Sequence, residues 1–370
     1  MNNMVGRLAL LLALLSCARP PPVLTGQVLS AGNEGGQDED PGVLHAADGR
    51  LYVAWYSNRN GLQDDGTEDR EIFLARSPDG ESWPDPPIQV TRAARDSFTP
   101  SLAQDSAGTF HLAWWRVIPT SLGGTNNQIL TKSSPDGTTW DLDQETVVAG
   151  GPGDFLPSIV HDRVASRLLV YFASPVRDAA GRVDLGAART LRLYACVNDG
   201  TGWSAPQRLS GVNDDATHNT FPFVVQREDG QFLMVWTRYR ASASADVLAV
   251  LSEASTETMT STSSNGIDWA EPVPVSSGGG QSVDVFPSLY PDAARSSWTA
   301  LWLTARQGAP SGDVVEVALD GALPAEPTAR PEITGYSPRA APLATPGRFL
   351  GVWVAGASGR QKIRFDFFSR

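Results

Sequence analysis

The sequence predicts an all-β protein, a six-bladed β-propeller whose last blade is closed by the N-terminal strand. The main observation is a proline-led strand that recurs six times, at intervals of about sixty residues, which is the period of a repeat architecture. The second is a large aromatic residue in the next strand of every repeat. The third is the composition, because 41% hydrophobic residues in a chain of 370 can form a large core and exclude a disordered chain.

The first two strands of each repeat form a predicted hairpin. The prolines that open the first strands are Pro41, Pro100, Pro157, Pro222, Pro287 and Pro338. The aromatic residues of the second strands are Trp55, Trp114, Tyr171, Trp236, Trp302 and Trp353. A turn such as Asp48-Gly49 separates the two strands, and this dipeptide is a strong hairpin signal.

The third and fourth strands complete each predicted blade. Residues 71–76 and 128–132 are examples of the third strand, and fourth strands are expected at 87–91, 145–149, 206–210 and 272–276. The last repeat ends with its third strand, at residues 362–370. Residues 27–30 match the fourth-strand pattern, so we expect the N-terminal strand to complete the final blade and close the ring.

The turn after the third strand has a sequence signature of its own. It reads Ser77-Pro78-Asp79-Gly80-Glu81-Ser82-Trp83 in the first repeat and Ser134 to Trp140 in the second, with weaker copies at 197–203 and 263–269. The signature resembles the Asp box, or BNR repeat, of the sialidases. The resemblance implies that the Asp binds turn amides, the Gly permits the turn and the Trp packs between strands. The corresponding residues are Ser77, Asp79, Gly80, Trp83, Ser134, Asp136, Gly137 and Trp140.

The N-terminal segment predicts export. Arg7 precedes a short apolar run, residues 8–15, which is too short to cross a bilayer as a helix. Residues 14–17 resemble the bacterial lipobox, which implies lipidation of Cys17 at the end of a signal peptide at 1–17, a tether at 18–25 and a propeller at 26–370. The chain would then lie in the bacterial cell envelope, on the outer membrane or periplasmic face. The alternative is an ordinary signal with an incidental Cys.

The net charge and the spacing of the histidines limit which partners and metals the chain is expected to bind. A net charge of −12 disfavours nucleic acid as a partner. We expect a glycan or a cell-envelope protein as the partner. We also expect membrane contact through the lipid anchor only, and a monomer. The four His residues lack paired ligand spacing, so no metal or cofactor is expected. Calcium stays open at the acidic clusters 38–40 and 64–69, where the spacing is not specific.

Long connections gather on one face of the predicted propeller, at 58–69, 117–127, 175–190 and 252–262. Loop-rich faces carry binding sites, so we expect function there, near the axis. The candidate ligand-binding residues on this face are Arg59, Arg116, Arg238, Arg306, Glu39, Asp96, Asp154 and Asp284. In the structural alternative the carboxylates cap inner strands and the arginines pair with neighbouring carboxylates.

The resemblance to sialidases extends to catalytic positions. Tyr336-Ser337 resembles the family's nucleophilic Tyr-Ser, and Asp64 and Asp65 resemble its acid/base Asp. Arg238 and Arg306 resemble the second and third arginines that bind the substrate carboxylate. The resemblance therefore implies Asp64, Asp65 and Tyr336 as candidate catalytic residues.

Two positions depart from the sialidase pattern. Glu39-Asp40-Pro41 replaces the family's Arg-Ile-Pro, and Thr220-Phe221 stands where the Glu that assists the Tyr is expected. Losing a charge-assisted bond and adding a like charge costs about 6 kcal/mol in substrate binding, or about 10⁴-fold. We therefore expect a sialidase-like propeller that binds an extracellular or periplasmic glycan or protein on its axial face, and processing of that ligand stays open. The alternatives are an active exo-acting glycoside hydrolase, of sialidase type or using Glu39 with Asp64 or Asp65, and a structural surface protein.

Overall fold

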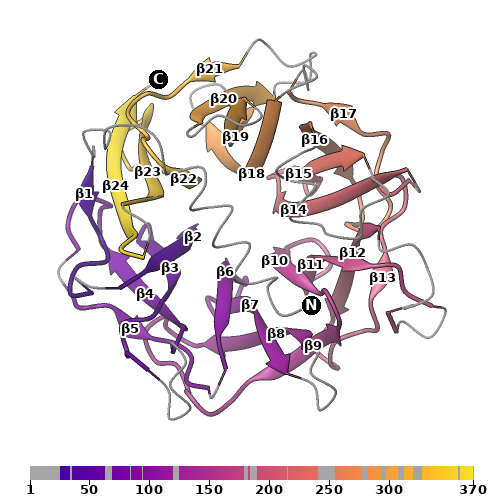
Figure 1. The fold of residues 1–370 in the computed structure, drawn as a ribbon, viewed down its shortest axis with the longest axis horizontal. Helices are drawn as coiled ribbons and strands as arrows, with labels where there is room; N and C mark the ends of the chain where they lie inside the picture. Colours follow the sequence, from indigo (N-terminus) through magenta and orange to yellow (C-terminus); the bar gives the residue numbers. More distant parts are fainter. Residues whose placement is uncertain are drawn as a thin grey trace.

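The protein forms six four-stranded sheets arranged as blades around a central axis (Figure 1). The computed structural model describes residues 26–33, 36–62, 69–83, 85–93, 95–119, 125–178, 182–183, 190–214, 216–240, 255–276, 282–292, 297–306, 312–319, 327–356 and 359–369. These residues contain strands and turns and no helix. The prediction of an all-β, six-bladed propeller is confirmed.

The strands of each blade follow one another from the axis outward. The first blade contains β2 (Asp38–His45), β3 (Leu51–Ser57), β4 (Glu71–Ser77) and β5 (Ile88–Gln89). The second contains β6 (Ser97–Gln104), β7 (Phe110–Pro119), β8 (Thr125–Ser134) and β9 (Thr146–Gly151). The third contains β10 (Phe155–Asp162), β11 (Arg167–Pro175), β12 (Leu191–Asn198) and β13 (Gln207–Arg208).

The other three blades repeat this order. The fourth contains β14 (Thr217–Gln226), β15 (Phe232–Arg240), β16 (Thr256–Ser263) and β17 (Val273–Pro274). The fifth contains β18 (Ser282–Asp292), β19 (Ser297–Arg306), β20 (Asp313–Leu319) and β21 (Thr328–Ala329). The sixth contains β22 (Tyr336–Pro342), β23 (Arg348–Ala355), β24 (Lys362–Ser369) and, from the other end of the chain, β1 (Gln27–Val28).

The ring is closed by pairing between the two ends of the chain. Gln27 lies opposite Phe365 and Val28 opposite Arg364 in an antiparallel ladder. The Leu29 N–H then donates a 2.8 Å hydrogen bond to the Ile363 carbonyl. The expected completion of the last blade by the N-terminal strand is therefore confirmed, and the outer edge of β24 is covered.

Large aromatic residues fill the space between sheets. The aromatic residue of every second strand is fully buried at the same position of its blade: Trp55, Trp114, Tyr171, Trp236, Trp302 and Trp353. Indole and phenol rings bury a large apolar area, so one ring at this position of each blade supplies much of the core between the sheets. The free thiol of Cys196 is also buried in this core.

Every first strand contains a bulge at its proline. The pairing register shifts there in all six blades, because proline lacks the N–H that the ladder needs. The residue before each proline has a positive φ, between 49° and 59°. These six residues, which we call the axial floor, are Asp40, Thr99, Leu156, Phe221, Phe286 and Ser337.

Neighbouring members of the axial floor contact one another across the blades. The ring centroids of Phe221 and Phe286 are 4.9 Å apart. The hydroxyls of Thr99 and Ser337 donate hydrogen bonds of 3.0 and 2.8 Å to the Asp40 carboxylate. The bulges thus bring residues from separate repeats together at the axis.

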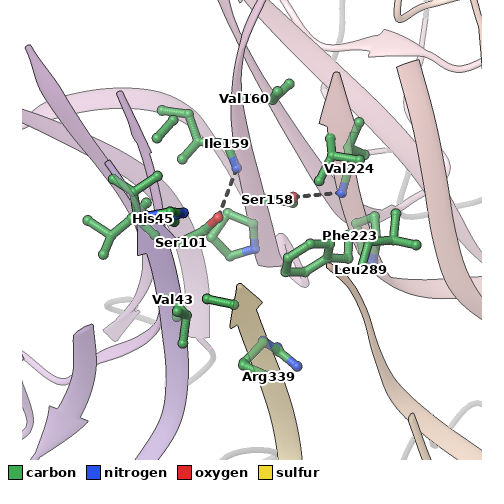
Figure 2. A pocket seen from close by; sticks show the side chains of 18 of the residues that line it. Val43, His45, Ser101, Ser158, Ile159, Val160, Phe223, Val224, Leu289 and Arg339 are labelled. Atoms are coloured by element: carbon green, nitrogen blue, oxygen red, sulfur yellow. Dashed lines mark hydrogen bonds between the residues drawn. The ribbon is translucent and has the colours of Figure 1, made fainter. Parts of the chain in front are cut away.

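Serines after the proline connect adjacent blades. Ser101 Oγ accepts a bond from the Ile159 N–H, and Ser158 Oγ accepts one from the Val224 N–H, each at 3.1 Å (Figure 2). The first blade has Gly42 instead, where an added Cβ would lie 2.5 Å from the Pro100 carbonyl oxygen. Only glycine fits that close approach.

The Asp-box turns hold their shape through backbone hydrogen bonds. Asp79 Oδ1 accepts the N–H groups of Glu81 and Ser82 at 2.8 Å, and Asp136 accepts the equivalent groups at 2.7 Å. The weaker copy at 263–269 keeps the same turn, because Asn265 Oδ1 accepts the N–H groups of Ile267 and Asp268 at 2.9 and 2.8 Å. An amide oxygen replaces the carboxylate there with the same geometry.

Two expected connections are wrong in part. In the connection expected at 117–127, residues 117–119 and 125–127 belong to β7 and β8 and pair with one another. Residues 256–262 belong to β16 and not to a connection, and they pair with β15 from Tyr239 opposite Thr256 onward. The run is rich in Thr and Ser, so it lacks the apolar alternation that identified the other strands, but its alternate side chains are buried between sheets. The expected signal, Cys17 and tether lie outside the described residues. Within the described chain, no helix is long and apolar enough to span a membrane.

Candidate functional site

The two faces of the ring differ in their connections. The loop face carries the connections from second to third strands and from blade to blade. The hairpin face carries the turns between first and second strands together with the Asp-box turns. Glu39 and Tyr336 each stand two residues before the proline of their inner strand, and their blades adjoin where the ring closes. With Tyr56 they form a group that we call the axial cluster.

Glu39 is the buried ionisable group of the axial cluster. Its side chain is only 1% exposed, and the Tyr56 hydroxyl, directly across the β2–β3 ladder, donates a hydrogen bond to Glu39 Oε2. Burial raises the pKa of Glu39 from 4.5 to about 7, while the hydrogen bond from Tyr56 and the charge of Arg70 oppose the rise. The carboxyl is therefore poised to exchange a proton near neutral pH.

Tyr336 lies beside this carboxyl. Burial, followed by the negative charges of Glu39 and Asp40, raises the pKa of Tyr336 well above its ordinary value. Its hydroxyl is buried and makes no hydrogen bond of ordinary geometry within the described residues. The sialidase comparison implied a Tyr without a carboxylate partner, but the structure places Glu39 next to it. The reason is ring closure, which brings the first and last blades together.

Arg70 joins the first and second blades near the axial cluster. Its guanidinium donates to Asp96 Oδ2 at 3.1 Å and to Gln37 Oε1 at 3.3 Å. The predicted ligand-binding residue Asp96 is thus part of an inter-blade ion pair whose two side chains are 20% and 24% exposed. Arg70 is the cation that acts on Glu39.

The predicted arginines pair inside their own blades. Arg59 Nη2 lies 3.3 Å from Asp38 Oδ1, Arg116 Nη2 lies 2.7 Å from Glu145 Oε1, and Arg238 Nη2 lies 2.8 Å from Glu257 Oε2. These ion pairs are those expected in the structural alternative, in which the arginines pair with neighbouring carboxylates. The three arginines do not converge on the axial cluster. The side chain of Arg306 lies outside the described part of the structure.

The carboxylates three residues before the prolines lie inside the blades. Asp154 pairs with Arg177, and both side chains are almost fully buried. Asp284 is buried as well, and burial raises the pKa of its carboxyl. In the first blade the equivalent Asp38 accepts the Trp55 indole N–H at 3.2 Å. The residues that approach the axis are instead those one and two positions before the proline.

Two sets of candidates remain, namely the predicted acids Asp64 and Asp65 and the residues considered for metal binding. Asp64 and Asp65 fall outside the described residues. Among the residues that the structure does describe, no group of three or more His, Cys, Asp or Glu side chains could hold a metal ion. In the acidic cluster 38–40, the carboxyls of Asp38 and Asp40 bind Trp55 and Ser337, respectively.

Sequence reasoning missed Tyr56, Arg70 and Arg177. Tyr56 follows Trp55, the aromatic residue that recurs in every repeat, and strand alternation turns the Tyr56 side chain to the opposite side. Arg70 ends a long connection and precedes β4 by one residue. The hairpin register would have placed Tyr56 opposite Glu39, whereas nothing in the local sequence indicates the partners of Arg70.

The geometry can be compared with solved structures. A protein of unknown function from Dyadobacter fermentans superposes with a TM-score of 0.66 at 14% identity, covering 94% of this chain and 98% of that one. An α-L-arabinanase from Penicillium chrysogenum, complexed with arabinobiose, gives a TM-score of 0.64 at 16% identity, covering 93% and 98%. A leech intramolecular trans-sialidase gives 0.62 at 11% identity, covering 94% and 70%.

The fold is the six-bladed propeller of the sialidases. Arabinanases share it, so the sialidase-like architecture expected from the Asp boxes is confirmed. No protein-family model and no curated protein sequence matches the chain. At these identities the comparisons establish the fold alone, and the function of this sialidase-like propeller has to be argued from its axial cluster.

Proposed function

We propose that the axial cluster binds a terminal, uncharged sugar on the loop face. The observation that carries the proposal is the Glu39 carboxyl held between two tyrosines at the axis. Carboxylates and phenols accept and donate the hydrogen bonds that sugar hydroxyls need. The Tyr336 hydroxyl is buried beside Glu39 and makes no hydrogen bond of ordinary geometry in the described chain, which leaves a donor without an ordinary partner at the axis.

The charge of the cluster favours neutral over acidic sugars. Glu39 occupies the position at which sialidases carry an Arg for the substrate carboxylate, and Asp40 adds a second buried carboxyl behind it. A like charge at about 4 Å costs up to about 4 kcal/mol at an effective dielectric constant of 20. The arabinanase with a related fold holds a neutral disaccharide, which supports this choice of ligand class.

A second candidate function is hydrolysis of the bound glycoside. It is favoured by a carboxyl with a pKa near 7 beside the Tyr336 hydroxyl. In the first step Glu39 takes the phenolic proton as the Tyr336 oxygen attacks the anomeric carbon, and the leaving oxygen takes a proton from an acid. In the second step water attacks the anomeric carbon and gives a proton to the acid's conjugate base, while the Tyr336 oxygen leaves and takes its proton back from Glu39, which releases the sugar. Asp64 and Asp65 remain the predicted acids.

A glycan array and a panel of aryl glycosides test both functions. We expect neutral glycans to bind and sialosides to fail, and we expect Glu39→Gln and Tyr336→Phe to reduce binding or turnover about tenfold or more. The matched controls are Glu81→Gln, in the first Asp-box turn, and Tyr52→Phe, whose ring is buried against Phe110 near the hairpin-face end of β3. Retained sugar binding in both axial variants would contradict the proposal. Failure of every sugar would move the search to protein partners or a structural role.

We also propose that the chain is exported and lipid-anchored through Cys17 in the cell envelope. The support is the lipobox-like run before Cys17 and the short apolar segment ahead of it. Mass spectrometry of the N-terminal peptide should find a diacylated Cys17, and Cys17→Ser should move the protein to the soluble fraction. An unmodified Cys17 in membrane-associated protein would contradict the anchor.

A further inference from the structure

The hairpin face holds a cavity that none of the proposed chemistry uses. It has a volume of about 370 Å³ and follows the six inner strands from the axial floor to their ends on this face. This volume is within the range of small-molecule sites in proteins. His45, at the end of β2, is exposed at the mouth, and Leu156, Phe221 and Phe286 of the axial floor line the inner end.

The charges in this cavity have one sign. Among the described residues that line it there is no Asp or Glu, although the chain has 41 of them against 29 Lys and Arg. The lining contains Arg163 and Arg339. An acid-free lining with two arginines, in a protein of net charge −12, attracts anions locally.

Arg339 is the cation deep in the cavity (Figure 2). Its Nη1 donates to the carbonyls of Phe286 and Pro338 at 3.4 and 2.9 Å, and its guanidinium carbon lies 5.5 Å from the centre of the Phe223 ring. No carboxylate of the described chain lies within salt-bridge distance, while Asp40, on the floor, acts on it electrostatically. A guanidinium has five N–H donors, so donors remain for a ligand.

The walls above Arg339 are apolar. Val43, Ile159, Phe223 and Leu289 line the cavity around the guanidinium (Figure 2). Ser101 and Ser158 already accept backbone N–H groups, so their hydroxyls serve the link between blades. The part of the cavity next to Arg339 therefore offers one charged anchor beside apolar side chains, and Arg163 lies elsewhere in the lining.

We propose that this cavity binds a small organic carboxylate with an apolar body, whose carboxylate pairs with Arg339 and whose hydrocarbon part contacts the surrounding walls. Arginine and carboxylate match in geometry and charge. The site is separate from the axial cluster and does not depend on the function proposed for it.

Isothermal titration calorimetry of the full-length protein with octanoate tests the proposal. We expect a single site for octanoate and at least about tenfold weaker binding of octan-1-ol and octylamine, because each lacks the anionic group. Arg339→Gln should weaken octanoate binding at least about tenfold. Val43→Trp fills the cavity without changing its charge and should abolish octanoate binding. The matched control Arg348→Gln removes an arginine elsewhere on the same face and should leave the affinity unchanged.

Two results would overturn the proposal. One is octan-1-ol binding as tightly as octanoate. The other is unchanged octanoate affinity in Val43→Trp, provided that circular dichroism and the unfolding temperature show it to be folded. Val43→Trp keeps the test valid if Arg339→Gln does not fold. Sugar binding at the axial cluster should be unaffected by Val43→Trp, which separates this test from that of the loop face.

Discussion

The Ser337 hydroxyl donates a 2.8 Å hydrogen bond to the Asp40 carboxylate, joining the last blade to the first at the axis. Thr99 of the second blade donates to the other carboxylate oxygen at 3.0 Å. One buried side chain thus connects three blades, and burial raises the pKa of this carboxyl while both hydrogen bonds lower it.

Asp40→Ala should destabilise the protein by about 2 to 4 kcal/mol, because the buried Ser337 hydroxyl loses its acceptor and the partly buried Thr99 hydroxyl loses the bond that it donates across the blades. Asp40→Asn should cost less than half as much, since Asn keeps an acceptor and tolerates the positive φ of 51°. Urea unfolding of both variants measures the difference. Equal destabilisation would show that the hydrogen bonds contribute little.

Stability should fall as pH rises because of Glu39. Below its unfolded pKa of 4.5 the carboxyl is protonated in both states, but above a folded pKa of about 7 the folded state carries an unfavourable buried charge. The full cost is about 3 kcal/mol, reached progressively between the two pKa values. Glu39→Gln should therefore be more stable than the original protein at about pH 8 and equal to it at about pH 4.

The matched variant for this pH effect is Glu81→Gln, whose exposed carboxyl pairs with Arg348. It removes no buried carboxyl, so it should not show the gain in stability at about pH 8 that is expected of Glu39→Gln. Glu71 is a second buried carboxyl with a pKa raised to about 7, so part of the pH dependence should persist in Glu39→Gln. A Glu39→Gln protein that is less stable at both pH values would contradict the assigned cost of burial.

Asp136→Ala should destabilise the second blade by about 1 to 2 kcal/mol, because two turn amides and the Thr139 hydroxyl lose their acceptor. The control is Asp143→Ala, a nearby exposed residue whose carboxylate makes no hydrogen bond or ion pair in the described structure. Thermal unfolding of the two variants should separate them. Identical unfolding temperatures would mean that the Asp box carries no stability.

Removal of residues 1–30 should cost at least about 2 kcal/mol and promote aggregation, since it removes β1 and buried Leu29 and uncovers the edge of β24. A chain that starts at Gly26 retains β1 and serves as the control. Light scattering and calorimetry compare the two. A monomeric, equally stable shorter chain would contradict closure by the N-terminal strand.

The fold was predictable because its signals are periodic and local. Each proline marks a bulged inner strand and each following aromatic residue marks a core position, so spacing alone gave the blade count and the role of β1. The strand β16 was predicted poorly because its Thr-rich sequence lacks apolar alternation. Hairpin turns and ladder register are set by neighbouring residues, which is why they follow from sequence.

The axial cluster was less predictable because it depends on distant residues. Glu39 and Tyr336 are in opposite halves of the chain, and only the angle at which the ring closes makes them neighbours. The sequence identified both residues but not their proximity. Which of Asp38, Glu39 and Asp40 approaches the axis depends on the bulge, and a bulge changes the direction of the side chains beside it.

The axial floor closes the inner end of the cavity on the hairpin face. It separates the cavity at Arg339 on one side from Glu39 and Tyr336 on the other, and two of its bulkiest members are Phe221 and Phe286. Both hold a positive φ, which glycine adopts without steric cost. Replacing the two phenylalanines by glycine would relieve backbone strain and extend the cavity toward the axial cluster.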